Sequence, residues 1–170
     1  MDIKKYIRDV PNFPKEGVLY RDITPLLKNH KAFSYVVNQL SAIIPKDVTS
    51  IVAPESRGFI FASAVCYKIN KNLVLVRKKG KLPHTTFQIE YELEYGTDTF
   101  QIHTDSLEYG SKIAIIDDLL ATGGTISAIE DLVKNFNCQI SCISFVIELL
   151  SLKGREKIKV KTDSLLSFDE

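Results

Sequence analysis

Hydrophobic residues recur along the chain at two spacings, and the spacing changes from one segment to the next. Spacings of three and four residues predict helices over 33–40, over 58–67 and from about Thr125 to Phe136. Unbroken apolar runs predict buried strands, which lie at Ser50–Ala53, Leu73–Val76, Lys112–Asp117 and Ile140–Leu149. Because these strands alternate with helices, the sequence predicts an α/β fold with a central, mainly parallel sheet flanked by helices.

One segment departs from this rhythm and alternates strictly between apolar and polar residues. From Thr86 to Tyr95, aromatic and aliphatic residues occupy one face, while Gln88 and three glutamates occupy the other. Gly96-Thr97-Asp98 predicts a turn, and Phe100 and Ile102 continue the alternation on a partner strand. The pattern predicts a β-hairpin that lies outside the strand–helix repeat and forms a flap.

Length and composition narrow the functional classes. A chain of 170 residues, 45% hydrophobic and 25% charged, favours one globular domain over 1–170. The net charge of +1 gives no field that would draw the chain to nucleic acid or a membrane surface. We expect a cytoplasmic protein, because the N-terminus lacks the apolar core of a signal peptide and no apolar run could span a bilayer. The three cysteines have no metal-ligand spacing.

The most informative stretch begins where the strand 112–117 ends. Asp117 and Asp118 come at the carboxyl end of that strand, where α/β proteins bind ligands, and carboxylates accept hydrogen bonds from ribose hydroxyls. The loop that follows offers backbone N–H groups, two hydroxyls and a helix N-terminus to a phosphate. Its residues are Ala121, Thr122, Gly123, Gly124 and Thr125. The loop fits neither the Walker A nor the dinucleotide-binding spacing. The alternative is a tight turn with Thr125 as a helix cap.

Several blocks resemble the type I phosphoribosyltransferases, enzymes that use 5-phosphoribosyl 1-pyrophosphate (PRPP). Ile115–Thr125 is similar to the family's PRPP motif, in the form found in members that act on adenine. The other similar blocks, in chain order, are Phe13–Leu27, Glu55–Phe59, Val76–Pro83, Leu93–Gly96 and Ser151–Glu156. The resemblance extends over nearly the whole chain.

The resemblance implies a reaction and a set of ligands. Adenine and PRPP would give AMP and pyrophosphate in purine salvage, through a transition state with positive charge on the ribose. The cofactor would be Mg²⁺, held mainly by PRPP, pyrophosphate and water, with no metal ligands assigned to the protein. The implied architecture is the type I phosphoribosyltransferase fold, with an N-terminal hood over 1–30, a flexible loop and hairpin over 78–103, and a homodimer.

The resemblance also implies roles for individual residues. Those for the ribose are Asp117 and Asp118, and those for the 5′-phosphate are Ala121 to Thr125. Those for pyrophosphate are Ser56, Arg57, Lys78 and Lys81. Those for adenine are Leu19, Tyr20, Arg21 and Leu149, with Tyr20 stacking on the base, Leu149 on its opposite face, and backbone groups of the other two at its edge. Those for catalysis are Glu94, Arg57 and Lys78, with Tyr95 in the closing flap.

Two other functions stay open at this stage. A transferase for hypoxanthine, guanine or xanthine would commonly offer a lysine to the base carbonyl, and no clear candidate lies beside Leu149. A PRPP-binding regulator without catalysis would need a nucleic-acid-binding segment or a basic face. The chain departs from the family pattern at His84, where glycine is usual, and at Tyr20, where phenylalanine is frequent. Neither change removes a required group, so we expect activity.

Overall fold

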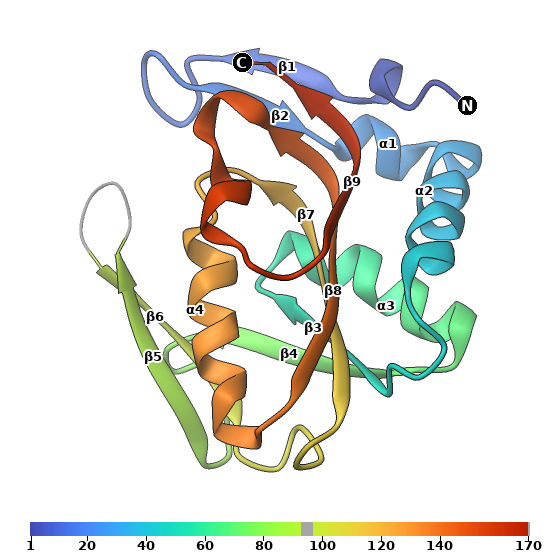
Figure 1. Ribbon diagram of the computed structural model, residues 1–170. Helices are drawn as coiled ribbons and strands as arrows, with labels where there is room; N and C mark the ends of the chain where they lie inside the picture. The colour runs from blue at the N-terminus through green and yellow to red at the C-terminus, as the bar shows by residue number, and fades with distance from the viewer. Residues whose placement is uncertain (93–96, 170) are drawn as a thin grey trace.

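The computed structural model describes residues 1–92 and 97–169, which build one seven-stranded sheet and a two-stranded ribbon (Figure 1). The sheet order is β5-β6-β4-β3-β7-β8-β9. The strands that run parallel are β3 (Ser50–Pro54), β4 (Asn72–Lys78), β7 (Lys112–Leu120), β8 (Gln139–Leu149) and β9 (Thr162–Phe168). The hairpin β5 (Thr86–Glu92) and β6 (Thr97–His103) joins the edge of the sheet antiparallel to β4. The predicted mainly parallel sheet is confirmed.

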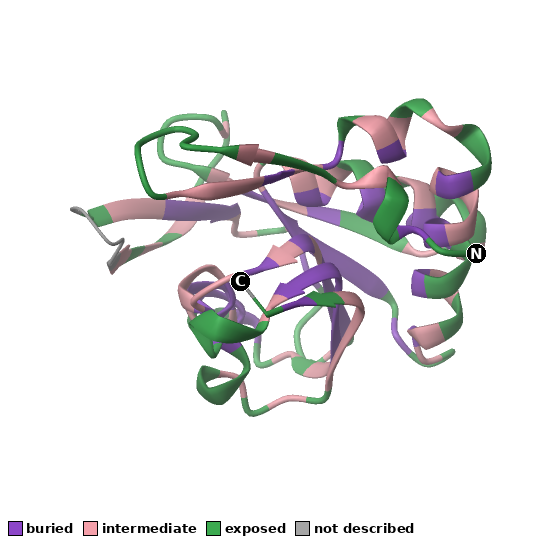
Figure 2. Cartoon of the chain, turned by 90° about the horizontal axis from the view of Figure 1, so that it is seen from above, coloured by how far each residue is buried: buried purple, intermediate pink, exposed green. Residues whose placement is uncertain are grey.

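Helices cover both faces of the sheet (Figure 1). The helices on one face are α1 (Thr24–Lys28), α2 (His30–Ile43) and α3 (Arg57–Ile69), and α4 (Gly124–Val133) lies on the other. Along β7, Ala114 and Ile116 enter the core beneath α2 and α3, while Ile113 and Ile115 enter the core beneath α4. The apolar run of β7 therefore follows from burial on both sides. In Figure 2 the buried residues concentrate along the sheet, whereas 11–17 at the N-terminal ribbon are exposed.

The observed elements are longer than the hydrophobic runs that predicted them. β7 continues past the acid pair to Leu120, because Leu119 and Leu120 stay in register with β8. The strand therefore does not end at Asp117, where the sequence predicted its end. Likewise β4 runs through Lys78, so this residue is the end of a strand and not part of the basic loop.

Several elements were missed from the sequence. The ribbon β1 (Arg8–Pro11) and β2 (Leu19–Asp22) lies across the carboxyl ends of β7, β8 and β9 (Figure 1). Its strands are too short and too polar to give a periodic signal. β9 was missed as well, together with the 3₁₀ turns η1 (Lys4–Tyr6), η2 (Lys134–Phe136), η3 (Leu150–Leu152) and η4 (Gly154–Lys157). The ribbon occupies the position of the expected hood.

The described part of the hairpin packs against α4 and against the 3₁₀ turn η2 that follows it. The Phe87 ring meets Phe136 edge-to-face at 5.4 Å, and Tyr91 stacks on Phe100 with ring centroids 4.5 Å apart. Apolar residues of β5 therefore share the face that the alternation predicted. Leu93 and Tyr95, predicted on the same face, lie outside the described residues.

Candidate active site

Arg57 joins three elements that are far apart in the sequence. It is the first residue of α3, and its guanidinium forms an ion pair with Asp118 near the end of β7. The same group donates hydrogen bonds to the Tyr20 hydroxyl and, at 3.4 Å, to the Arg21 carbonyl, both on β2. Residues predicted to bind pyrophosphate, ribose and base are thus brought together beneath the hood.

Burial makes the ion pair of Arg57 and Asp118 a fixed feature of this site. The Asp118 side chain is 5% exposed and that of Arg57 is 25% exposed. Desolvation works to lower the pKa of Arg57, but the Asp118 carboxylate and the Tyr20 hydroxyl outweigh it and raise that pKa. Arg57 therefore stays a cation at any physiological pH, as binding of an anionic ligand requires.

Asp117 has a different environment from its neighbour. Desolvation, with a further contribution from the charge of Asp118, raises the pKa of Asp117 well above its ordinary value. Its Oδ1 accepts a hydrogen bond from the Asp118 N–H at 2.8 Å. A Cβ added to Gly58 would lie 2.8 Å from the same oxygen, so the carboxylate sits tightly against the first turn of α3. The two acids are therefore not equivalent: Asp118 is ion-paired, while Asp117 is half-buried and more easily protonated.

The loop 121–125 connects β7 to α4 in a conformation that depends on glycine. Gly123 is the N-cap of α4 with φ of 80°, in the left-handed region, and Gly124 begins the helix. The loop and its neighbours 119–126 surround a small hollow of about 60 Å³. The first N–H groups of a helix have no partner within it and attract anions. The helix begins slightly earlier than predicted, and the hollow lies where the sequence predicted a phosphate site.

Lys78 is held by the hairpin instead of projecting from a loop. Its Nζ lies 2.9 Å from the Asp98 carboxylate on β6. Its backbone N–H donates to Glu55 at 3.0 Å, and Arg77 donates twice to the same carboxylate at 3.2 Å. Burial opposes ionisation of Glu55, but these donors outweigh it and lower its pKa. The side chain of Lys81 is exposed, as is Ser56 beside Arg57.

The residues predicted for the base lie on the hood and at the end of β8. Tyr20 is half-buried, with the Phe13 ring edge-on at 5.1 Å and the Arg57 guanidinium 5.1 Å from its centroid. Its hydroxyl, the departure from the family pattern, finds its partner in Arg57. Leu19 and Leu149 are also half-buried.

Arg21 serves the hood through its side chain. The side chain is 5% exposed, pairs with Asp9 on β1, and lies 4.1 Å from the centroid of the Phe168 ring at the end of β9. Only the backbone of Arg21 faces the site residues, through the carbonyl that accepts from Arg57. That backbone groups of Arg21 meet the edge of the base stays a prediction.

Three further residues singled out from the sequence belong to the predicted hairpin and the segment before it. Glu94 and Tyr95 lie outside the described residues. His84 is placed at the base of the hairpin, where its backbone N–H donates to His103 Nε2 at 3.3 Å and the two rings meet edge-to-face.

Over 1–92 and 97–169, no group of three or more His, Cys, Asp and Glu side chains is arranged to hold an ion. The half-buried carboxylate of Asp117 nevertheless supplies oxygen of the kind that Mg²⁺ accepts. The chemistry of the site fits an ion that is bound mostly through substrate oxygens and water.

Two polar residues near the site escaped the sequence reasoning. Glu148, the penultimate residue of β8, is 5% exposed and forms an ion pair with Arg155. A single carboxylate inside the apolar run 142–149 was a usable signal, because such a group needs a partner when buried. Its partner follows only seven residues later in the chain.

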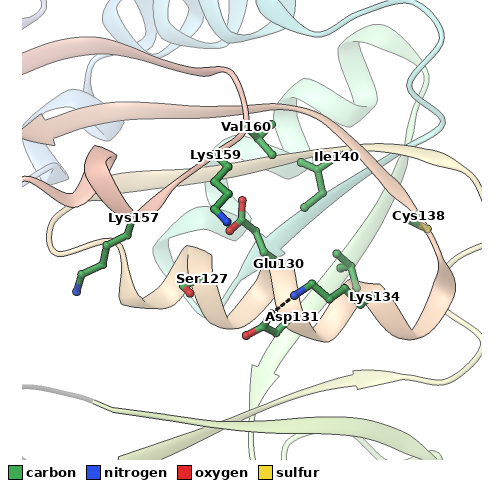
Figure 3. A pocket seen from close by; sticks show the side chains of 10 residues that line it. Ser127, Glu130, Asp131, Lys134, Cys138, Ile140, Lys157, Lys159 and Val160 are labelled. Carbon is green, nitrogen blue, oxygen red and sulfur yellow. Dashed lines mark hydrogen bonds and ion pairs between the residues drawn. The ribbon is translucent and has the colours of Figure 1, made fainter.

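A separate hollow of about 470 Å³ runs along α4 (Figure 3). It is lined by Glu130, Lys159 and residues around them, and Glu130 and Lys159 point toward each other there. It shares no residue with the site described above.

In the described part of the chain, no helix combines the length and apolar character needed to cross a membrane.

Comparison with known proteins agrees with this fold. Residues 25–168 match the family model described as "Phosphoribosyl transferase domain". The chain therefore belongs to the phosphoribosyltransferase family.

Its relatives within that family are adenine phosphoribosyltransferases. The one from Pseudothermotoga lettingae is 49% identical over 94% of each chain. The crystal structure of the Thermoanaerobacter pseudethanolicus enzyme is 46% identical, with a TM-score of 0.94 over 98% of each chain. The Saccharomyces cerevisiae enzyme, solved with adenine and an imino-altritol bisphosphate, is 35% identical, with a TM-score of 0.90 over 97% of each chain. The chain belongs with these adenine phosphoribosyltransferases, which have the type I phosphoribosyltransferase fold expected from the sequence.

Proposed function

We propose that this protein transfers the phosphoribosyl group of PRPP to adenine, releasing AMP and pyrophosphate. One observation carries the proposal: Arg57 contacts Tyr20 and Asp118 at once, so one cation lies between the base side and the ribose side of the site. The names of the relatives and the adenine bound in the yeast enzyme support the choice of base.

The reaction needs charge stabilisation more than a nucleophilic side chain. Breaking the bond at the anomeric carbon builds positive charge on the ribose and negative charge on pyrophosphate. Arg57, which remains a cation, stabilises the departing pyrophosphate, and Ser56 adds hydrogen-bond donors beside it. Asp117 and Asp118 accept hydrogen bonds from the ribose hydroxyls, and the loop 121–125 holds the 5′-phosphate at the N-terminus of α4.

The base is bound by flat contact and by backbone groups. The Tyr20 ring stacks on adenine, and Leu149 covers the opposite face. The carbonyl and N–H groups of Leu19 and Arg21 read the edge of the ring. Since the Arg21 side chain is committed to Asp9 and Phe168, no charge from that residue reaches the base. A neutral, backbone-lined pocket suits adenine better than bases that carry a carbonyl in place of its amine.

The flap completes the site. Lys78 and Lys81 approach the pyrophosphate when the segment 78–103 closes, which excludes water from the reacting ribose. For Lys78 this means leaving Asp98, its partner on β6. Glu94 acts as the acid/base group for the purine, and Tyr95 lies in the closing segment. When bound, mainly through PRPP, pyrophosphate and water, Mg²⁺ would supply positive charge that neutralises the phosphates.

A homodimer and a cytoplasmic setting complete the proposal. Tyr67 on α3 is 93% exposed, and Ile60, seven residues earlier on the same helical face, is 38% exposed. Large apolar groups on one helix face are typical of surfaces covered by another chain, here a second copy. Ile23 and Leu26, which follow the ribbon, are buried in the chain's own core and offer no such surface. The three cysteines carry free thiols, which suits the reducing cytoplasm.

The test is turnover by the purified protein. With adenine, PRPP and Mg²⁺, we expect AMP and pyrophosphate to form in equal amounts. Omitting adenine should abolish AMP and leave at most slow release of pyrophosphate. If the protein binds PRPP but forms no AMP, the proposal is wrong and a regulatory role takes its place.

A further inference from the structure

The phosphate loop 121–125 rests on Gly154, a residue that has no role so far. A Cβ added to Gly154 would lie 2.1 Å from the Ala121 carbonyl oxygen and 2.9 Å from the Gly123 amide nitrogen. In the other direction, a Cβ on Gly123 would lie 2.5 Å from the Gly154 carbonyl oxygen. Gly154 is buried, and its φ is not in the left-handed region. The close approach of two backbones, and not an unusual conformation, is therefore what excludes a side chain at Gly154.

The residue next to Gly154 is anchored to the sheet. Arg155 Nε donates to one oxygen of Glu148 at 2.8 Å, and its Nη2 pairs with the other. The same Nη2 donates to the Ser164 hydroxyl at 2.8 Å, and Nη1 donates to the Thr162 carbonyl. A guanidinium that meets both oxygens of one carboxylate has a fixed orientation. Arg155 therefore fixes the start of η4, including Gly154, relative to β8 and β9.

Glu148 lies next to the proposed base site, so its ion pair with Arg155 connects that site to the loop. Glu148 is nearly buried and directly precedes Leu149, the residue proposed to cover one face of adenine. Glu148 and Arg155 directly flank the short segment 149–154, so their ion pair holds its two ends together. One end of the segment borders the base site, and the other touches the phosphate loop. Residues 150–153 between these ends are exposed, so the segment is held by its ends and not by core packing of its middle.

We propose that Gly154 and the ion pair of Arg155 with Glu148 position the loop 121–125 for the 5′-phosphate of the ribosyl ligand. The proposal rests on the proposed function, because it concerns the same ligand. The three residues are positioning residues: they contact the loop and the sheet, and we assign them no contact with the ligand. Donors that hold a phosphate must lie within hydrogen-bond distance, and a displacement of about 1 Å can cost on the order of 10²-fold.

The experiment separates phosphate binding from base binding by comparing AMP with adenosine. The ratio of the adenosine Kd to the AMP Kd, from calorimetry, measures what the 5′-phosphate contributes. Gly154→Ala pushes its methyl group against Ala121 and should lower this ratio by about tenfold or more. Gly110→Ala is the control: Gly110 has φ of 75° and no atom within 4 Å of an added Cβ, and it precedes the far end of β7. Its alanine variant should lose stability without changing the ratio.

Arg155→Lys provides a second variant that places no new atom in the loop. It keeps the charge but cannot meet both oxygens of Glu148, so the ratio should fall in the same direction. If folded Arg155→Lys keeps the wild-type ratio to within about twofold, the inference is overturned, whether or not Gly154→Ala folds. Turnover of adenine and PRPP by the wild type is measured in parallel. A wild type that turns over, with variants of unchanged ratio, contradicts only the positioning role, whereas a wild type that forms no AMP contradicts the proposed function.

Discussion

Arg57 is the residue on which the described part of the active site converges. Its guanidinium contacts an acid on β7, a hydroxyl on β2 and a carbonyl on β2, so it links the sheet to the hood. The sequence predicted Arg57 to bind pyrophosphate but did not predict its contacts with Tyr20 and Asp118. Tyr20 and Arg57 are 37 positions apart in the chain, and no local pattern reports a contact over such a separation.

Tyr20→Phe tests the link between Tyr20 and Arg57. The variant keeps the ring and removes the hydroxyl that accepts from Arg57. Since the group is half-buried and its partner is charged, we expect unfolding free energy to fall by about 1 kcal/mol in chemical denaturation. Turnover should persist, because stacking needs only the ring. Tyr109→Phe, at a 79% exposed position away from the site, is the matched control and should change neither quantity. A loss of turnover beyond about tenfold in Tyr20→Phe would show that the hydroxyl has a direct catalytic role.

The strands and helices with strong hydrophobic patterns were predictable, and the polar or short ones were not. β3, β4, β7 and β8 were identified because both of their faces are buried, which leaves a continuous apolar run. The ribbon β1–β2 is stabilised by long-range contacts such as that of Arg21 with Phe168, which only the fold creates. The acid pair and the strand-to-helix loop 121–125 were predictable because they are contiguous in the sequence. The contact of the loop with Gly154 was not, because it depends on where η4 returns to the sheet.

The connection between β8 and η4 should show in the acid dependence of stability. Hydrogen bonds from Arg155 are the main cause that lowers the pKa of Glu148 in the folded protein, against the opposing effect of burial. A carboxyl group with a lowered folded pKa stabilises the protein above its unfolded pKa, near 4.5, and that contribution is lost as pH falls through the folded value.

Glu148→Gln removes this titration. We expect the wild type to be more stable than Glu148→Gln at pH 7, and the difference in unfolding free energy to shrink steadily below about pH 4.5. Urea denaturation at a series of pH values measures it. Glu156→Gln, at an exposed position in η4, is the control. A difference that stays constant down to pH 2 would mean that the ion pair does not contribute through its charge.

At the scale of the molecule, the ribbon β1–β2 lies over the carboxyl ends of the parallel strands (Figure 1), and Arg57 contacts both the ribbon and β7. Helix α3 takes part in both the site and the proposed dimer surface. Its first residue, Arg57, contacts the site residues, and its outer face carries exposed apolar residues. A second copy seated on that face would therefore lie close to the pyrophosphate side of the site. The proposed dimer and the proposed activity are linked through this helix.

Tyr67→Glu tests the dimer. A charge in place of the exposed ring should prevent a second copy from covering α3, because the carboxylate would be desolvated without a partner. Analytical ultracentrifugation should find the wild type as a dimer and the variant as a folded monomer. Tyr109→Glu, at a position 79% exposed in the turn before β7, is the control and should stay dimeric. A monomeric wild type, or a dimeric Tyr67→Glu, would exclude this face as the interface.

The choice of base distinguishes the proposed activity from that of transferases for other purines, and a competition assay measures it directly. PRPP and Mg²⁺ are supplied with equal concentrations of adenine, hypoxanthine and guanine, and the nucleotides formed are separated and counted. We expect AMP to exceed IMP and GMP by on the order of 10²-fold or more, because the site offers backbone groups suited to the adenine edge. IMP or GMP as the main product would contradict the account.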